Sequence, residues 1–297
     1  MRHASRPGAC VARTTHGIAL LVLTLSASRL HAQERPAPPG DSARKLEAVT
    51  VTAIRAGGLA PISAKTITRE RIEPRYFGQD IPLVLQSAPS LTSYSETGTY
   101  WGYSYMRLRG IDQSRINLTL DGIPLNDPED QVLYFADFPD LANSLHSVQI
   151  QRGTGTSSNG TAAYAGSINF ETLPIASLAR GGEVQVGGGS FGAKRASIEY
   201  QTGLLPSRFA FYGRLSGYQV EGYRYHSGME GRSGFFSGGW FGDRDIVKVI
   251  ATAGLFADTM AYLAVPESEL ATDRRINPLR PDELDRFGEQ LVAAAYT

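Results

Sequence analysis

Hydrophobic and polar residues alternate along the second half of the chain, from residue 181 onward. In one stretch Phe209, Phe211 and Leu215 fall on one face, while Arg214 and Ser216 fall on the other. Alternation with one apolar face predicts antiparallel β-strands, which could form a soluble sheet or the wall of a membrane barrel. The predicted strands are 183–189, 193–202, 208–220, 232–241, 246–256 and 290–296.

The connections between these strands favour a barrel wall. The turns 203–207 and 242–245 are short and fall on the same side of the sheet, whereas the longer connections 221–231 and 257–289 fall on the other side. Short turns on one side and long loops on the other are typical of outer-membrane barrels. Glycine is also concentrated here, with 17 of the 32 glycines between Gly181 and Gly254, as expected for strongly curved strands and tight turns.

Residues 60–180 show shorter, mixed patterns that predict a compact block of helices and strands. Short helices are expected at 68–76 and 80–87, and short strands at 106–109, 116–120 and 147–151. Asp121 and Gly122 stand between two apolar residues, which is a signal for a tight turn. This block is long enough to bury a core of its own.

The first 32 residues predict a secretory signal peptide. Three arginines precede an apolar run at 17–25, and Ala32 offers a small residue for cleavage. The run is about half the length of roughly 20 residues that a membrane-spanning helix needs. The single cysteine, Cys10, precedes the run, so cleavage after Ala32 would remove it.

Residues 33–59 predict a flexible tail, because proline, glycine, serine and charged residues dominate its first half. Within it, residues 46–53 (LEAVTVTA) form a β-prone segment. A partner protein can capture such a segment by β-augmentation, although the first strand of the following domain would have the same pattern.

Composition and motifs exclude several functions. The 29 basic residues balance the 29 acidic ones, so the chain lacks the positive excess typical of nucleic-acid binding. No histidine pair has metal-ligand spacing, and no nucleophile motif is present. Residues 187–192 match a dinucleotide fingerprint, but a strand pattern follows where a helix is required. We therefore expect no catalytic residues, no bound metal, no cofactor and no enzymatic activity.

Three segments of the block 60–180 resemble, in this order, the plug domain of TonB-dependent outer-membrane receptors. They are YMRLRGI at 105–111, LDGIPL at 120–125 and VQIQRG at 148–153, the last followed by YAGSINF at 164–170. The chain departs from the family where Gly153-Thr154-Gly155 replaces the usual Gly-Pro. The resemblance implies an α+β plug domain followed by a transmembrane antiparallel β-barrel, in the outer membrane of a Gram-negative bacterium.

The resemblance also implies roles for particular residues. Residues 46–53 are similar to the box that binds TonB, the partner linked to the inner-membrane energising complex, with contacts from Glu47, Ala48, Val49, Thr50, Val51 and Thr52. Arg109 and Arg152 are implied to pair with wall glutamates and lock the plug, the alternative being ordinary surface arginines. Plug loops that contact the ligand are expected at Tyr100, Trp101, Tyr103, Asn126 and Asp127. We expect the aromatic residues to form an exposed loop, and a plain solvated loop is the alternative for the other two.

The length then predicts an incomplete barrel. At roughly 10 residues per strand, 22 strands need over 200 residues, whereas 115 residues extend from 183 to 297. The expected organisation is a signal peptide at 1–32, a tail at 33–59, a plug domain at 60–180 and about six of 22 barrel strands at 181–297. We expect an amino-terminal fragment of a longer receptor, or else a decayed gene, with the glutamate partners beyond Thr297.

The implied function is TonB-dependent import of a ferric chelate, with the chelate as transported ligand, lipid around the barrel and a monomer as the complete form. A weaker resemblance at 100–103 and 266–270 favours a ferric dicitrate-like cargo or another siderophore. The alternatives are a passive porin, an adhesin, or a receptor for a ligand without iron such as cobalamin.

Overall fold

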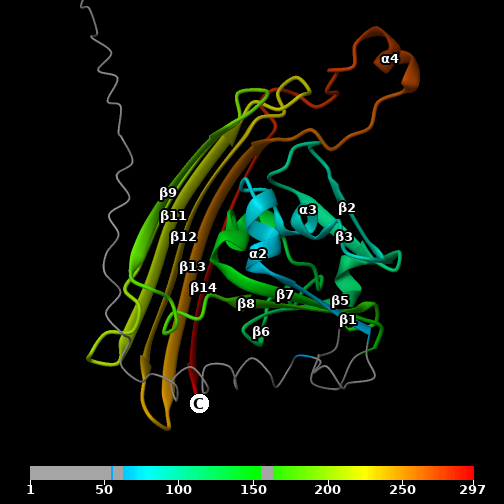
Figure 1. The fold of residues 1–297 in the computed structure, drawn as a ribbon. Helices are drawn as coiled ribbons and strands as arrows, with labels where there is room; N and C mark the ends of the chain where they lie inside the picture. Colours follow the sequence, from blue (N-terminus) through cyan, green and yellow to red (C-terminus); the bar gives the residue numbers. More distant parts are fainter. Residues whose placement is uncertain (1–54, 56–62, 155–162) are drawn as a thin grey trace, which may run out of the picture. The chain divides into compact units, whose positions relative to one another are not determined.

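The computed structural model describes residue 55, residues 63–154 and residues 163–297. The predicted signal peptide and the segment 46–53 lie outside these residues. The described part forms three sheets, two in the block before residue 180 and one after it (Figure 1). None of the helices in the described part is long and apolar enough to span a membrane.

The first block contains a five-stranded mixed sheet in the order β1-β7-β8-β5-β6. Its strands are β1 (Ser63–Thr68), β5 (Ile116–Leu120), β6 (Ile123–Pro124), β7 (Leu145–Arg152) and β8 (Gly166–Thr172). Strands β5 and β8 pair in parallel, and the other pairs are antiparallel. Asp121 and Gly122 connect β5 and β6 with φ of +47° and +87°, so the predicted tight turn is confirmed.

A smaller sheet and short helices complete this block. The sheet contains β2 (Leu91–Ser95), β3 (Ser104–Leu108) and β4 (Ile111–Asp112), and the helices are α2 (Arg69–Ile72) and α3 (Ile81–Leu85). Short 3-10 turns lie at Glu73–Arg75, Gln113–Arg115, Phe135–Asp137 and Leu141–Ser144. The predicted helices and strands are therefore present, and their apolar side chains form a buried core that includes Leu85, Met106, Leu118, Val148 and Phe170.

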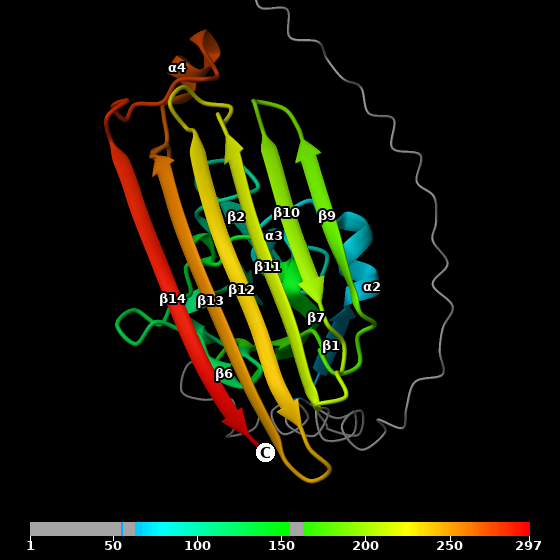
Figure 2. The same ribbon diagram turned by 90° about the vertical axis from the view of Figure 1, so that its left-hand side faces the viewer.

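The third sheet is a meander of six antiparallel strands, in which each strand pairs with the next (Figure 2). The strands are β9 (Gly181–Gly188), β10 (Lys194–Gln201), β11 (Phe209–Val220), β12 (Met229–Phe241), β13 (Ile246–Thr259) and β14 (Leu284–Tyr296). The six predicted strands are confirmed. The last four contain 12 to 14 residues each, enough to cross a bilayer at the tilt of a barrel strand.

Three strands begin earlier than predicted, and one ends later. β9 begins at Gly181, β12 at Met229 and β14 at Leu284, while β13 extends to Thr259. The early part of β14 carries acidic residues at Asp285 and Glu289, which interrupt a simple apolar alternation. Pairing with β13 over the whole length of β14 supplies the hydrogen bonds that hold this polar segment in the sheet. The loop with the short helix α4 (Glu267–Thr272) is correspondingly shorter than predicted.

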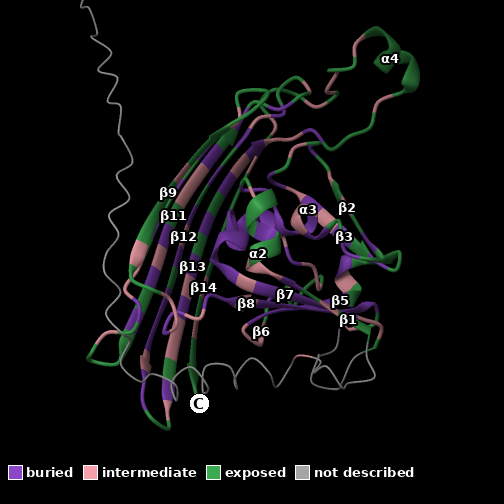
Figure 3. Cartoon of the chain, viewed as in Figure 1, coloured by how far each residue is buried: buried purple, intermediate pink, exposed green. Residues whose placement is uncertain are grey.

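The two faces of this sheet have the polarity of a membrane wall. In β11, Leu215 is 65% exposed, whereas the neighbouring Arg214 is 2% exposed. A soluble sheet would bury the leucine and expose the arginine. Exposed apolar side chains continue on the same face of the other strands, at Val186, Ile198, Phe236, Leu255 and Val292. Buried and exposed positions alternate along the strands (Figure 3), so we refer to the sheet as the wall and to the preceding block as the plug.

The face of the wall with the buried arginines packs against the plug. Ala210, Tyr212, Phe235 and Ile250 of the wall belong to the same apolar core as the plug residues. A glycine allows the closest approach, because a Cβ on Gly254 would lie 1.9 Å from the carbonyl oxygen of Asp137. The loops 221–228 and 260–283 lie at one end of the wall, and the turns 202–208 and 242–245 lie at the other.

Candidate functional site

A cavity of about 470 Å³ lies between the plug and the wall, at the end where the long loops are. The plug contributes Phe77, Tyr100 and Trp101 to its lining. The wall contributes Phe191, Tyr223, Arg195 and a run of three glycines at 187–189. Five aromatic side chains thus line the cavity, from both the plug and the wall, and a flat or ring-containing ligand would find extensive contact there.

Two of the predicted ligand residues, Tyr100 and Trp101, line this cavity, but in different ways. Tyr100 is 56% exposed and packs edge-on against Phe77 at 5.0 Å. Trp101 is 6% exposed, stacks on Tyr218 of β11 at 4.9 Å and donates from Nε1 to the carbonyl of Gly78 at 2.7 Å. The expectation of a wholly exposed aromatic loop is wrong for Trp101, because the wall offers it an aromatic stacking partner.

The other three predicted ligand residues do not line this cavity. Tyr103 donates a hydrogen bond to Asp285 of β14. Asn126 fastens its own loop, since its amide donates to the carbonyl of Ile116 and its oxygen accepts from the backbone of Leu118. Asp127 is exposed and accepts from the amide of Glu129. The ligand role of these residues stays a prediction.

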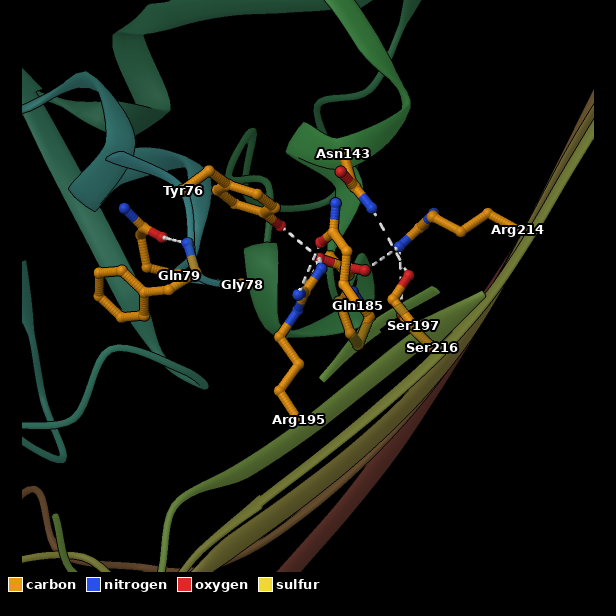
Figure 4. Close-up of polar contacts among 12 residues, drawn as sticks. Tyr76, Gly78, Gln79, Asn143, Gln185, Arg195, Ser197, Arg214 and Ser216 are labelled. Carbon is orange, nitrogen blue, oxygen red and sulfur yellow. Dashed lines mark hydrogen bonds and ion pairs between the residues drawn. The ribbon is translucent and has the colours of Figure 1, made fainter. Parts of the chain in front are cut away.

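A buried ion cluster centred on Asp140 joins the plug to the wall. Arg195 of β10 lies 2.7 Å from Asp140 Oδ1, and Arg214 of β11 lies 2.8 Å from Oδ2. Tyr76 of the plug donates to Oδ1 at 2.6 Å. Figure 4 shows Tyr76, Arg195 and Arg214 converging from the plug and from the wall. The side chains of Asp140, Arg195 and Arg214 are 2%, 6% and 1% exposed, so water screens these charges very little.

The electrostatics of this cluster favour a charged Asp140. Burial alone would raise the pKa of its carboxyl group, but the guanidiniums of Arg214 and Arg195 outweigh burial and hold the pKa below its usual value. Burial and the neighbouring carboxylate raise the pKa of the Tyr76 hydroxyl, which keeps it a hydrogen-bond donor. The plug is thus fixed to β10 by charge-assisted hydrogen bonds from Arg195 to Asp140, and to β11 by the ion pair between Arg214 and Asp140.

A second ionic contact lies toward the other end of the wall. Lys248 of β13 lies 3.0 Å from Asp121 Oδ2 and donates to Thr172 Oγ1 at 3.0 Å. Asp121 also accepts from the Thr172 backbone amide at 2.8 Å. The carboxylate of the predicted turn therefore has two structural functions, since it closes the β5–β6 connection against β8 and binds the wall.

The predicted lock arginines have other surroundings. Arg109 is exposed, and Arg152 donates to the hydroxyl of Ser63 while its buried Nε has no hydrogen-bond partner. Within the described residues, neither arginine has a carboxylate at ion-pair distance. Their pairing with wall glutamates stays a prediction. The ion pairs of Asp140 and Asp121 have the opposite polarity, with the carboxylate on the plug and the cation on the wall. A different plug arginine does face a wall glutamate, since Arg69 of α2 lies 3.9 Å from Glu199 of β10.

Acidic residues also meet where the plug faces β13 and β14. Asp137 is 2% exposed, and burial, followed by the charges of Glu289 and Asp285, raises the pKa of its carboxyl group to about 7. Asp258 is equally buried, and its Oδ1 has no hydrogen-bond partner. In the ranges 63–154 and 163–297, no group of three or more His, Cys, Asp or Glu residues is arranged to hold a metal ion.

Arg55 fastens the start of the plug, two residues after the segment 46–53. Its guanidinium lies 3.0 Å from Glu171 of β8 and donates to Ser147 Oγ of β7 at 2.8 Å. Sequence reasoning missed Arg55, Asp140 and Arg195. A signal of this kind was available at Arg214. This charged residue lies on the same face of its strand as Ser216, opposite the face that carries the apolar residues.

Comparison with known proteins identifies the two parts of the chain. Residues 59–167 match the family model of the TonB-dependent Receptor Plug Domain. The solved ferric citrate transporter FecA, in its unliganded form, is similar with a TM-score of 0.65 and 17% identity, over 79% of this chain and 37% of that one. The ferric yersiniabactin uptake receptor FyuA from Yersinia pestis is similar with a TM-score of 0.58 and 16% identity, over 80% of this chain and 38% of that one.

A third solved structure, of P. aeruginosa FpvA bound to a heterologous pyoverdine, gives a TM-score of 0.65 and 14% identity, over 80% of this chain and 32% of that one. No curated protein matches the chain significantly. At these identities the structural likeness concerns the fold, and it confirms a plug followed by strands of a barrel wall. The chain spans less than two fifths of the length of these solved chains.

Proposed function

The chain carries the plug domain and six wall strands of an outer-membrane TonB-dependent receptor, and from this premise we propose that it takes part in TonB-energised import of a ferric chelate. The observation that carries the proposal is the aromatic cavity between the plug and the loop end of the wall, directly beside the buried ion cluster of Asp140. A passive channel would have no use for a plug fixed in this way.

In the proposed mechanism, the ligand binds at the loop end of the wall, where Tyr100 and Trp101 face the cavity. TonB captures residues 46–53 as an added strand and pulls on them. Arg55 is the first described residue after this segment, so force would reach β7 and β8 through its contacts with Ser147 and Glu171. Ion pairs between plug and wall can then break one after another, which opens a path without unfolding the wall.

The ferric nature of the cargo is supported by the proteins with similar folds. These proteins include a ferric citrate transporter, a ferric yersiniabactin uptake receptor and a ferric-catecholate import receptor. The aromatic side chains that line the cavity are suited to chelates of moderate size. We further propose that the wall is completed by additional strands, and that Arg109 and Arg152 pair with glutamates of those strands.

Deletion of residues 46–53 from the complete receptor tests this function. Uptake of radioactive iron is measured in iron-limited cells with a panel of ferric chelates, and binding to the cell surface is measured in parallel. The matched control deletes the equally long segment 34–41 of the same tail. We expect the first deletion to abolish uptake and retain binding, and the control to preserve both. Undiminished uptake after deletion of 46–53 would instead support a porin or an adhesin, and uptake of cobalamin alone would exclude the ferric cargo.

A further inference from the structure

The cavity and the Asp140 cluster share one residue, Arg195 of β10. Its side chain lines the cavity beside Phe77, Tyr100 and Trp101. Its Nε and Nη2 both donate to Asp140 Oδ1, at 3.2 and 2.7 Å. Of the described residues that line the cavity, Arg195 is the only charged one. Any ionic recognition of a ligand in this cavity therefore involves the residue that also holds the plug.

Direct contacts connect the lining of the cavity to the Arg195 side chain. The Trp101 indole donates to the carbonyl of Gly78, and a Cβ on Gly78 would lie 2.3 Å from Arg195 Cδ. Gly78 has a φ of +103°, so the position also favours glycine for its backbone. Figure 4 shows Gly78 next to Arg195, with Gln185 on the other side. A ligand that displaces Trp101 would also displace Gly78 and the guanidinium beyond it.

The charge balance leaves Arg195 available for an anion. Arg195 and Arg214 share the single carboxylate of Asp140, and no other carboxylate of the described residues lies within ion-pair distance of either. The pair of guanidiniums therefore carries one positive charge in excess. An arginine has five N–H donors, and the contacts of Arg195 to Asp140 and Gln185 use three of them.

We propose that Arg195 couples occupation of the cavity to release of the plug. An anionic group of the ligand takes hydrogen bonds from Arg195 and competes with Asp140 for it, so that ligand binding weakens the contact between the plug and β10. The proposal rests on the proposed import function and specifies how the ligand site regulates it. The aromatic lining selects an anion attached to a flat ring, such as an aromatic carboxylate.

The test uses the complete receptor with a single reactive cysteine introduced by Thr50→Cys, and it measures labelling of that cysteine by a hydrophilic maleimide. The probe is 2,3-dihydroxybenzoate, and its uncharged counterpart 2,3-dihydroxybenzamide is the matched control. Affinity for each compound is measured by calorimetry. We expect the benzoate to bind and to accelerate labelling several-fold, and the benzamide to do neither.

Substituted variants distinguish this coupling from a non-specific destabilisation of the receptor. We expect Arg195→Gln to lose at least tenfold in benzoate affinity and to show no acceleration, and Arg195→Lys to recover part of both. Lys248→Gln removes a different wall cation, one that pairs with Asp121 outside the cavity, and it should keep the benzoate affinity and the acceleration. If Arg195→Gln responds to benzoate as the unmodified receptor does, or if benzoate does not bind the unmodified receptor, the proposal is wrong.

Asp140→Asn gives the most specific signature. Because coupling between two sites is reciprocal, freeing Arg195 from Asp140 should increase benzoate affinity by about 5- to 150-fold. The same substitution should raise the labelling rate without any probe. A merely structural role of Asp140 would lower affinity or leave it unchanged, and that result would overturn the coupling. The import function would still stand if deletion of 46–53 abolished uptake, so the two hypotheses fail separately.

Discussion

Asp140→Asn is the substitution that most directly probes how the plug is held. Asparagine has nearly the same size and keeps an oxygen for the Tyr76 hydroxyl, but it carries no charge. Arg195 and Arg214 would then lose the only described carboxylate at ion-pair distance from either, in a place where less than a tenth of either side chain is exposed to water. Burial of an unpaired charge is costly, and relief requires the plug to move away from β10 and β11.

The magnitude follows from the two ion pairs. At an effective dielectric constant of about 20, two charges about 4 Å apart attract by about 4 kcal/mol, which gives about 8 kcal/mol for the two pairs. Removing the carboxylate also removes the several kcal/mol that its own desolvation costs. The docked state of the plug therefore loses about 3–5 kcal/mol of stability, which is typical when one partner of a buried ion pair is removed. At about 1.4 kcal/mol per factor of ten, this shifts the equilibrium between the docked plug and the plug released from β10 and β11 by about 10²- to 10⁴-fold toward release.

Hydrogen–deuterium exchange of the complete receptor measures this change. We expect amides near Tyr76 and Asp140 to exchange faster by that factor, while amides of the wall strands keep their protection. The control is Asp243→Asn, which removes an ion pair with Arg208 at 2.9 Å whose side chains are 72% and 46% exposed. Such surface pairs contribute about 0–1 kcal/mol. Equal effects of the two substitutions would refute the claim that the buried cluster fixes the plug.

Three further predictions concern other contacts of the plug. The pKa of Asp137 is raised to about 7 in the folded protein, so the folded state is most stable below the pKa of about 4 that an aspartate has in the unfolded chain. The melting temperature should therefore fall as pH rises from about 4 to about 7, and the Asp137→Asn variant should lack this pH dependence. Gly254→Val should destabilise the docked plug by about 1–3 kcal/mol in thermal melting, because its side chain would meet the Asp137 carbonyl, whereas Gly213→Val, with open space around it, should not. Glu171→Gln should lower exchange protection of β8 by about 1.5–3 kcal/mol through loss of the charged partner of Arg55, and unchanged protection would contradict this.

Much of the fold could be predicted from local patterns. Phe209, Phe211 and Leu215 against Arg214 marked both the strand and its two faces, because side chains of a strand alternate strictly. The Asp121-Gly122 turn was predictable for a similar reason, since both residues tolerate positive φ. The start of β14 was missed because its hydrogen bonds to β13, and not an apolar alternation, hold residues such as Asp285 in the sheet.

The candidate site was predictable only in part. Tyr100 and Trp101 were identified from their aromatic character, but the stacking of Trp101 on Tyr218 depends on a contact across more than 100 residues. The Asp140 cluster has the same origin, because its partners lie 55 and 74 residues further along the chain. Nothing local distinguishes Asp140 from other aspartates in turns. Long-range ion pairs of this kind follow from the docking of two domains.

The central claim is that import depends on energy delivered by TonB. The most direct measurement compares accumulation of radioactive iron, supplied as a ferric chelate, in cells that contain the complete receptor with and without TonB. We expect the chelate to bind to the cell surface in both cases and to accumulate inside only when TonB is present. Equal accumulation in the two strains would contradict it.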